Sequence, residues 1–354
     1  MSNKERVDRL RQAMRAEGLD GLIVAGPANI RYLTGLEAED AWLLVAPRRL
    51  YYVTDSRYTL AVGRQLKSQD VEVVEYKKDP YQYIGRLLRA RKTRWLGFDE
   101  REFSVAQYKR LDRQVPAMIR LKGVSGMVER LRLRKDKQEL RLIRKALRIH
   151  ARALGVLQES LRPGQAEREV LERLTVFIKK EKAGFSFPPI IASGRNSCFP
   201  HAKVTDRKIR ANEPVLVDFG VQVRGYKSDL TRMFFLGRMT ALVQRVCAHV
   251  REAQRRAIAL AAPGVPVAEL DRAARQYLAK QDLARWFGHA LGHGVGLEIH
   301  EAPRLSQNSR EVLQSGMVVT IEPGVYLPNR FGVRIEDMIL ITDKGCEVLS
   351  DNIH

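Results

Sequence analysis

Four carboxylates stand inside apolar, strand-like stretches of this 354-residue chain, where acidic side chains are unusual. They are Asp218 in VLVDFGV, Asp229 in GYKSDLTR, Glu322 in VVTIEPG and Glu336 in GVRIEDM. Carboxylates are almost never fully buried unless they are paired or bind a metal. Arg232 and Arg334 are available as partners, but four carboxylates on one sheet would repel one another without a cation. The pattern therefore indicates a cation site, with Asp218 and Asp229 brought together by a hairpin at Arg224-Gly225.

Four of the seven histidines lie near these strands: His201, His289, His293 and His300. Three of them fall within one glycine-rich segment, GHALGHGVGLEIHE, which is more typical of a site than of a core. His289 and His293 are four residues apart, so they would share one face if the segment were helical. The glycines at 288, 292, 294 and 296 predict a close approach of the backbone to a metal or a substrate.

Carboxylate oxygens with one imidazole suit Mn²⁺, Co²⁺ or Zn²⁺ better than a thiolate-bound metal. Carboxylates can also bridge two cations, and two metals can clamp the attacking and leaving oxygens of a hydrolysis. Two motifs for other chemistry are excluded. GHGVG does not open a helix after a strand, as a dinucleotide fingerprint would. The HExxH motif is absent because His300-Glu301 is followed by Ala-Pro-Arg.

The elements that must position these residues fall into two regions. In the first, apolar runs at GLIVAG, AWLLVAP, LYYVTD and VEVVEY alternate with helical patterns, which predicts an α/β domain over residues 1–126. The second region, residues 127–354, opens with a long basic helix from about Arg134. Strand-like runs rich in glycine and proline follow, interrupted by helices at Leu242–Ala262 and Val267–Gln281. This order predicts an α+β domain, and its repeated helix-then-strand pattern suggests an internal repeat.

Composition narrows the class of protein. A chain with 45% hydrophobic and 29% charged residues is typical of globular proteins, and no apolar run of about 18 residues predicts a membrane span. Three well-separated cysteines and a charged N-terminus predict a cytoplasmic protein without a disulfide framework. The net charge is +21, and residues 101–150 hold 15 basic against 5 acidic residues. We expect a solvated helical face rather than a nucleic-acid site, because no nucleic-acid-binding motif accompanies this excess.

Five motifs, in this order, resemble those of metallopeptidases with the pita-bread fold: PHAK at His201, VDFGVQVRGYKSDLTR, GHGVGLEIHE, TIEPGVY and GVRIEDM. The resemblance is greatest to the Xaa-Pro peptidases, aminopeptidase P and prolidase. The run NIRYLTGL and the strand before it are similar to the creatinase-type N-terminal domain. The resemblance implies a creatinase-like α/β domain over residues 1–126, followed by an α+β pita-bread catalytic domain over residues 127–354.

The resemblance also implies five metal ligands. Asp218 and Asp229 match the first two, and His293 and Glu322 match ligands of the second cation. Asp229 and Glu336 match the positions that bridge both cations. Because all five are present, the resemblance argues against the catalytically silent relatives, and against creatinase, which lacks the metals.

The remaining site residues follow from the same resemblance. The positions that match catalytic residues are His201, His300 and Glu322, the last as general acid and base. The positions that match substrate-binding or supporting residues are His289, Arg304, Tyr326 and Arg334. In the prolidase branch, an arginine in the region of Arg304 clamps the free carboxylate of a dipeptide, for which a planar guanidinium is suited. Arg334 would orient the carboxylate of a ligand residue.

The implied activity is hydrolysis of the peptide bond preceding proline, by a hydroxide that two divalent cations activate, Mn²⁺ ahead of Co²⁺ or Zn²⁺. The substrate would be a peptide with proline in second position, and the protein would form a homodimer, as its relatives commonly do. One alternative is a non-catalytic pita-bread protein that binds nucleic acid or the ribosome through its basic surface. Another is a different enzyme of this fold, such as a methionine aminopeptidase. The five ligands disfavour the first, and the long N-terminal domain disfavours the second.

Overall fold

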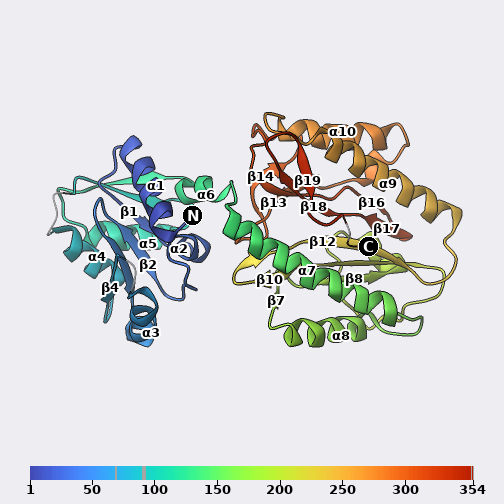
Figure 1. Cartoon of the computed structure of the whole chain (residues 1–354), viewed down its shortest axis with the longest axis horizontal. Coiled ribbons are helices and arrows are strands. Elements are labelled where there is room, and N and C mark those ends of the chain that lie inside the picture. Colours follow the sequence, from blue (N-terminus) through green and yellow to red (C-terminus); the bar gives the residue numbers. More distant parts are fainter. Residues whose placement is uncertain (68–69, 90–92, 352, 354) are drawn as a thin grey trace. The chain divides into compact units, whose positions relative to one another are not determined.

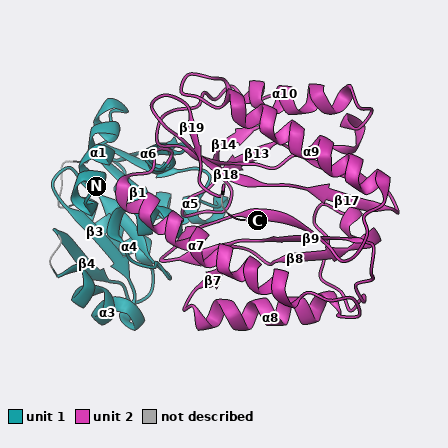
Figure 2. Cartoon of the chain, turned by 45° about the vertical axis from the view of Figure 1, so that its right-hand side comes forward, with its two compact units in different colours: residues 1–132 teal, residues 133–354 magenta. Residues whose placement is uncertain are grey.

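The computed structural model describes residues 1–67, 70–89, 93–351 and 353. The chain forms two compact units, residues 1–132 and 133–354 (Figure 2). The sequence placed the change of domain after residue 126, before the short helix α6 (Met127–Arg132). That helix belongs to the first unit because it packs there against helices α1 and α2. A buried hydrogen bond of 2.7 Å from Arg132 to the Asn29 side chain holds its end in place.

The first unit is a six-stranded sheet with helices, as the alternating pattern predicted (Figure 1). In chain order its elements are α1 (Asn3–Ala16), β1 (Gly21–Val24), α2 (Pro27–Thr34), β2 (Trp42–Val45), β3 (Leu50–Thr54), α3 (Ser56–Leu66), β4 (Val71–Glu75), α4 (Pro80–Arg89), β5 (Trp95–Asp99), α5 (Val105–Gln114), β6 (Arg120–Val124) and α6. The strand order is β4-β3-β2-β1-β5-β6, with β1, β5 and β6 parallel to one another. Helix α1 begins with a capping box between Ser2 and Glu5, and its apolar stripe of Val7, Leu10 and Met14 is buried.

The second unit contains antiparallel strand pairs and four long helices. Its helices and 3₁₀ turns are α7 (Lys137–Ser160), α8 (Glu167–Lys180), η1 (Gly194–Cys198), α9 (Ala241–Leu260), α10 (Val267–Ala279) and η2 (Ala284–Trp286). Its strands are β7 (Gly184–Phe185), β8 (Ile190–Ser193), β9 (Pro214–Phe219), β10 (Val221–Val223), β11 (Tyr226–Lys227), β12 (Leu230–Phe235), β13 (Gly292–Gly294), β14 (Glu301–Leu305), β15 (Val318–Ile321), β16 (Gly324–Leu327), β17 (Phe331–Arg334), β18 (Asp337–Ile341) and β19 (Cys346–Val348). The two helices predicted at 242–262 and 267–281 are confirmed as α9 and α10.

The strands of the second unit lie between two helix pairs (Figure 1). The sheets have the orders β12-β9-β8, β11-β10-β7, β14-β13-β15-β18-β19 and β16-β17. Helices α7 and α8 pack against strands of the first two sheets, and α9 and α10 pack against β14 to β17. The apolar faces of α9 and α10 join strands β15 and β18 in one core, which contains Val250, Leu270, Val319 and Ile339. This frame holds the strand ends that carry the acidic residues.

The internal repeat suggested by the sequence is visible in the turns that join each helix pair. Gly164, after α7, donates its backbone N–H to the carbonyl of Ile209 over 2.8 Å. Gly264, after α9, donates in the same way to Leu313 over 2.9 Å. Both glycines have a positive φ, of 92° and 88°. The second unit is therefore built from two halves with the same helix-turn-helix entry.

No helix in the described part of the chain is both long and apolar enough to cross a bilayer.

Candidate metal centre

The two aspartates lie on the paired strands β9 and β12 of the second unit. Asp218 is the penultimate residue of β9 and faces Thr231 of β12, and Asp229 directly precedes β12. Between these strands, β10 and β11 form the predicted hairpin, with its two-residue turn at Arg224-Gly225. Both turn residues have a positive φ, of 48° and 84°, as this tight turn requires. The hairpin returns the chain so that both aspartates, 7% and 4% exposed, are buried close together.

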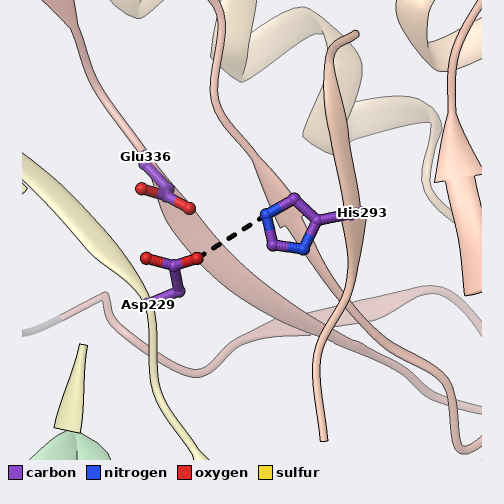
Figure 3. Close-up of side chains that lie close together, drawn as sticks. All are labelled: Asp229, His293 and Glu336. Carbon is purple, nitrogen blue, oxygen red and sulfur yellow. Dashed lines mark ion pairs between the residues drawn. The ribbon is translucent and has the colours of Figure 1, made fainter. Parts of the chain in front are cut away.

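The other ligand candidates come from the second half of the unit. His293 lies in β13, Glu322 follows β15, and Glu336 stands between β17 and β18. The Nε2 atom of His293 is 3.6 Å from Oδ2 of Asp229 and 3.3 Å from Oε1 of Glu322. Ligand atoms of Asp229, His293 and Glu336 all lie within 4.8 Å of one another (Figure 3). Three segments that are distant in sequence therefore place one imidazole and two carboxylates around one point.

The segment around His293 is a strand, so His289 and His293 do not share a helical face. The strand register shifts between His293 and Gly294, which is a bulge of the kind that re-aims side chains at sites. The flanking glycines also permit a close approach between strands. A Cβ on Gly292 would lie 2.1 Å from the Thr320 carbonyl oxygen, and one on Gly294 would lie 2.2 Å from the Ala302 carbonyl oxygen. These glycines let neighbouring strands approach, and that contact sets the position of His293.

The electrostatics of the cluster fit a cation. Burial, together with the neighbouring Glu336 carboxylate, raises the pKa of Asp229 well above its usual range. Burial and the Glu322 charge do the same to the pKa of Glu336. Oδ1 of Asp218 and Oε1 of Glu336 are buried without a hydrogen-bond partner among the described residues. Buried acceptors without donors are costly unless a cation binds them, so these oxygens are suited to divalent metals.

Arginine pairing accounts for only one of the four carboxylates. Arg334, 3% exposed, donates to Oδ2 of Asp218 over 2.5 Å and to the Tyr326 hydroxyl over 2.6 Å. Arg232 instead donates to Oδ1 of Asp337 over 2.7 Å. The hydroxyl of Tyr326 also contacts Nε2 of His289 at 3.0 Å. Arg334 therefore orients the Asp218 side chain from behind and links it to the Tyr326–His289 pair.

Three other predicted site residues lie at or near the solvent-facing side of the cluster. The ring of His300 lies 4.3 Å from that of His293, nearly perpendicular to it, and burial with the nearby His293 lowers its pKa. His201 is exposed and contributes to the same lowering of the His300 pKa. Arg304 is exposed and pairs with His293 across β13 and β14. Because directly paired residues project from the same face of a sheet, Arg304 shares the face that carries His293.

Two threonines that sequence reasoning missed hold the ligands in place. The Thr231 hydroxyl donates to Oε2 of Glu336 over 2.8 Å and accepts from Nε of Arg334 over 3.0 Å. The Thr320 hydroxyl donates to Oε1 of Glu322 over 3.2 Å and accepts from the backbone N–H of His293 over 3.1 Å. Each threonine lies two residues from an acidic ligand candidate, so strand alternation was the signal that could have found them.

Comparison with known proteins identifies the family. The model of metallopeptidase family M24 matches residues 141–343. The chain belongs to metallopeptidase family M24. Residues 6–134 of this M24 protein also match the creatinase/prolidase N-terminal domain. These matches confirm the predicted family and both predicted fold types.

Relatives of this M24 protein align along nearly its whole length. An Xaa-Pro dipeptidase of Pyrococcus furiosus is 34% identical to it, over 98% of each chain. The structure of an Xaa-Pro dipeptidase from Bacillus anthracis has a TM-score of 0.94 and 32% identity, covering 99% of this chain and 98% of that one. The structure of an X-Pro aminopeptidase from Thermotoga maritima has a TM-score of 0.88 and 31% identity, covering 96% and 97%.

Proposed function

We propose that this protein hydrolyses the peptide bond that precedes proline, with two divalent cations bound at the candidate metal centre. One observation carries the proposal: Asp229, His293 and Glu336 converge in a chain that aligns with an Xaa-Pro dipeptidase over 98% of its length. The residues proposed to hold the cations are Asp218, Asp229, His293, Glu322 and Glu336. Their donor set favours Mn²⁺ ahead of Co²⁺ or Zn²⁺.

Bound cations of this kind lower the pKa of water and polarise a carbonyl group. The chain's own residues would then move the protons. An amide nitrogen leaves only after it has received a proton, and the nitrogen of the X-Pro bond, a tertiary amide, carries none of its own. We assign that transfer to the Glu322 carboxylate, which would take a proton from the attacking water and pass it to this nitrogen. The hydroxyl of Thr320 orients Glu322 over 3.2 Å. The imidazole of His300, whose lowered pKa keeps it neutral, would donate a hydrogen bond to the carbonyl oxygen of the scissile bond.

Substrates test this proposal directly. The purified protein, loaded with Mn²⁺, should hydrolyse X-Pro dipeptides and X-Pro-initiated tetrapeptides but leave X-Ala peptides intact. An Asp229→Asn variant should lose at least about 100-fold in kcat/KM and bind less metal, because even residues that only orient a ligand contribute 10–100-fold. Asp206→Asn removes an exposed carboxylate of the same unit and should change neither property.

Two outcomes would contradict the proposal. Full activity of a metal-replete Asp229→Asn protein would exclude Asp229 as a required metal ligand. Absence of X-Pro hydrolysis with Mn²⁺, Co²⁺ and Zn²⁺ would favour the non-catalytic alternative. We further propose a cytoplasmic homodimer, which sedimentation of the purified protein and fractionation of cells would check.

A further inference from the structure

A pocket of the second unit lies at the other end of the strands that carry the candidate metal centre. Its volume is about 860 Å³, within the range of small-molecule sites. Pro214, the first residue of β9, and Phe331, the first residue of β17, line it. Asp218 lies four residues further along β9, about 13 Å away at the rise of a strand, and Arg334 ends β17. The pocket is thus separate from the metal centre but shares two strands with it.

Positive charge dominates the pocket lining. Its lining contains one carboxylate, Glu213, and five basic side chains, which are those of Arg195, Arg207, Lys208, Arg210 and Arg330. Two of the five are already engaged. Arg207 binds Glu213 through both terminal nitrogens, at 2.6 and 2.7 Å, and Lys208 binds Glu169 at 2.8 Å. The pocket therefore keeps an excess of cations after its own carboxylate is neutralised.

The three remaining arginines have no counter-ion. Within the described ranges, the side chains of Arg195, Arg210 and Arg330 make no hydrogen bond or ion pair, and all three residues are exposed. They come from three separate segments: η1, the loop before β9, and the turn between β16 and β17. In water these exposed guanidinium groups repel one another only weakly, but together they give the hollow a positive potential that attracts an anion.

We propose that this pocket binds a small polyanion carrying phosphate groups. A guanidinium is a planar fork that matches phosphate oxygens with two hydrogen bonds, and three forks can hold more than one phosphate. The amino-terminal end of α9 also lines the pocket, and its first turn has no acidic residue to oppose an anion. A polynucleotide would instead favour a track of cations spaced along its backbone, rather than three arginines around one hollow.

Calorimetric titration of the metal-loaded protein with inorganic pyrophosphate tests the proposal. The variant carries Arg195→Gln, Arg210→Gln and Arg330→Gln together. Its matched control carries Arg141→Gln, Lys145→Gln and Arg148→Gln, three exposed residues of α7 whose replacement removes the same charge. Pyrophosphate should bind the pocket variant at least about tenfold more weakly than the wild type, because one charge-assisted hydrogen bond has that effect. The control should bind like the wild type.

Three results would overturn the proposal. Equal binding by all three proteins would place pyrophosphate elsewhere, for example at the metal centre. Equal weakening in both variants would indicate diffuse attraction by the net charge. Tighter binding of a single-stranded oligonucleotide than of pyrophosphate, lost in the pocket variant, would make the occupant a nucleic acid. The rate of X-Pro hydrolysis and the midpoint of thermal unfolding should match the wild type in every variant. If the triple variant does not fold, the single Arg330→Gln change, which lies in an exposed turn, replaces it in the titration.

Discussion

A substitution at Arg304 tests which of two substrate classes this chain prefers, the X-Pro dipeptides or the longer X-Pro peptides. Arg304 lies opposite His293 across β13 and β14, and it is exposed. If it clamps the free carboxylate of a dipeptide, Arg304→Ala should raise KM for X-Pro dipeptides about tenfold, the order of one charge-assisted hydrogen bond. The kcat for X-Pro dipeptides and the KM for X-Pro tetrapeptides should change little in this variant. Steady-state kinetics with both substrates measure this difference.

The neighbouring Arg310 provides the control, because it is also exposed and six residues further along the chain. Arg310→Ala should alter neither substrate's KM. Arg304→Lys should restore only part of the dipeptide affinity, because an ammonium group offers a charge without the planar fork. Equal KM changes for both substrates, or none, would favour an aminopeptidase P activity.

At the residue scale, the sequence was sufficient to predict the site residues whose charge conflicts with their apolar neighbours. Asp218, Asp229 and Glu336 stood out because each is an acid in an apolar, strand-like stretch of sequence, although only Asp218 lies within a strand. Thr231 and Thr320 did not, because threonine is common in strands and its hydrogen bonds are visible only in three dimensions. Arg232 and Arg334 were both available as partners for the buried carboxylates, and the structure shows that Arg334 binds Asp218 whereas Arg232 binds Asp337.

At the scale of elements, helix α7 buries an imidazole behind the metal-bearing strands. His150 is fully buried, with its ring 3.9 Å from that of Phe219 and its Nδ1 3.2 Å from the Ser228 hydroxyl. Burial, and secondarily the charge of Arg232, lowers the pKa of His150 well below its usual value. The native state therefore keeps this ring neutral at a pH where the unfolded chain protonates it.

This difference predicts a pH dependence of stability. Below about pH 6.5, unfolding takes up a proton at His150, so stability is complete above that pH and falls as the pH decreases toward the lowered native pKa. The loss from one such group is at most about 1.4 kcal/mol per pH unit. In His150→Phe, which retains a ring beside Phe219, this part of the slope should disappear. Urea unfolding of the metal-free proteins at pH 7.5 and 5.5 measures it.

The quantity to compare between the proteins is the slope of the free energy of unfolding against pH, rather than the free energy at one pH. His249→Phe, at a partly buried histidine that bonds Tyr277, is the matched control for the replacement of a histidine by phenylalanine. An identical slope in the wild type and His150→Phe would show that the native protein protonates His150 as readily as the unfolded chain does.

Helix boundaries were predictable because their signals are local. The stretch from Leu242 to Ala262 carries an apolar stripe of the right period and ends near Pro263-Gly264. The segment around His293 has no such signal, since four-residue spacing between histidines fits a helix but glycine-rich sequence fits irregular strands. Tertiary contacts make this segment a strand rather than a helix, because Gly292 and Gly294 pack against the backbones of neighbouring segments.

At the scale of the whole molecule, metal binding should stabilise the second unit, which supplies every ligand candidate. A cation at 100 times its dissociation constant adds about 2.7 kcal/mol to the free energy of unfolding. For a unit of this size, that corresponds to a rise of about 5–10 °C in the unfolding midpoint. Scanning calorimetry with and without a chelator should show this shift in the wild type and in Asp206→Asn. Asp229→Asn should show a much smaller one; an undiminished shift would place the metal elsewhere.

The repeat within the second unit was only hinted at by the sequence. The order of helices and strands suggested it, but the two halves contribute different ligand candidates, two aspartates from the first and a histidine and two glutamates from the second. The two halves share a Pro-Gly pair at Pro163-Gly164 and Pro263-Gly264, and the backbone geometry of the two turns matches. Backbone hydrogen bonds between distant segments leave little trace in the sequence. Helices leave a clear one, because their apolar residues recur at a regular spacing.

That two-half construction has a consequence for how the protein is made. The first half contributes Asp218 and Asp229, and the second contributes His293, Glu322 and Glu336. More than 100 residues separate Asp229 from Glu336, so at 5–20 residues per second the ribosome completes the ligand set roughly 5–20 s after the first half has emerged. During that interval the two aspartates lack their imidazole partner, and a nascent chain should hold the cation far more weakly than the finished one. Metal loading is therefore expected to be a post-translational event, and metal retention should report that both halves have docked.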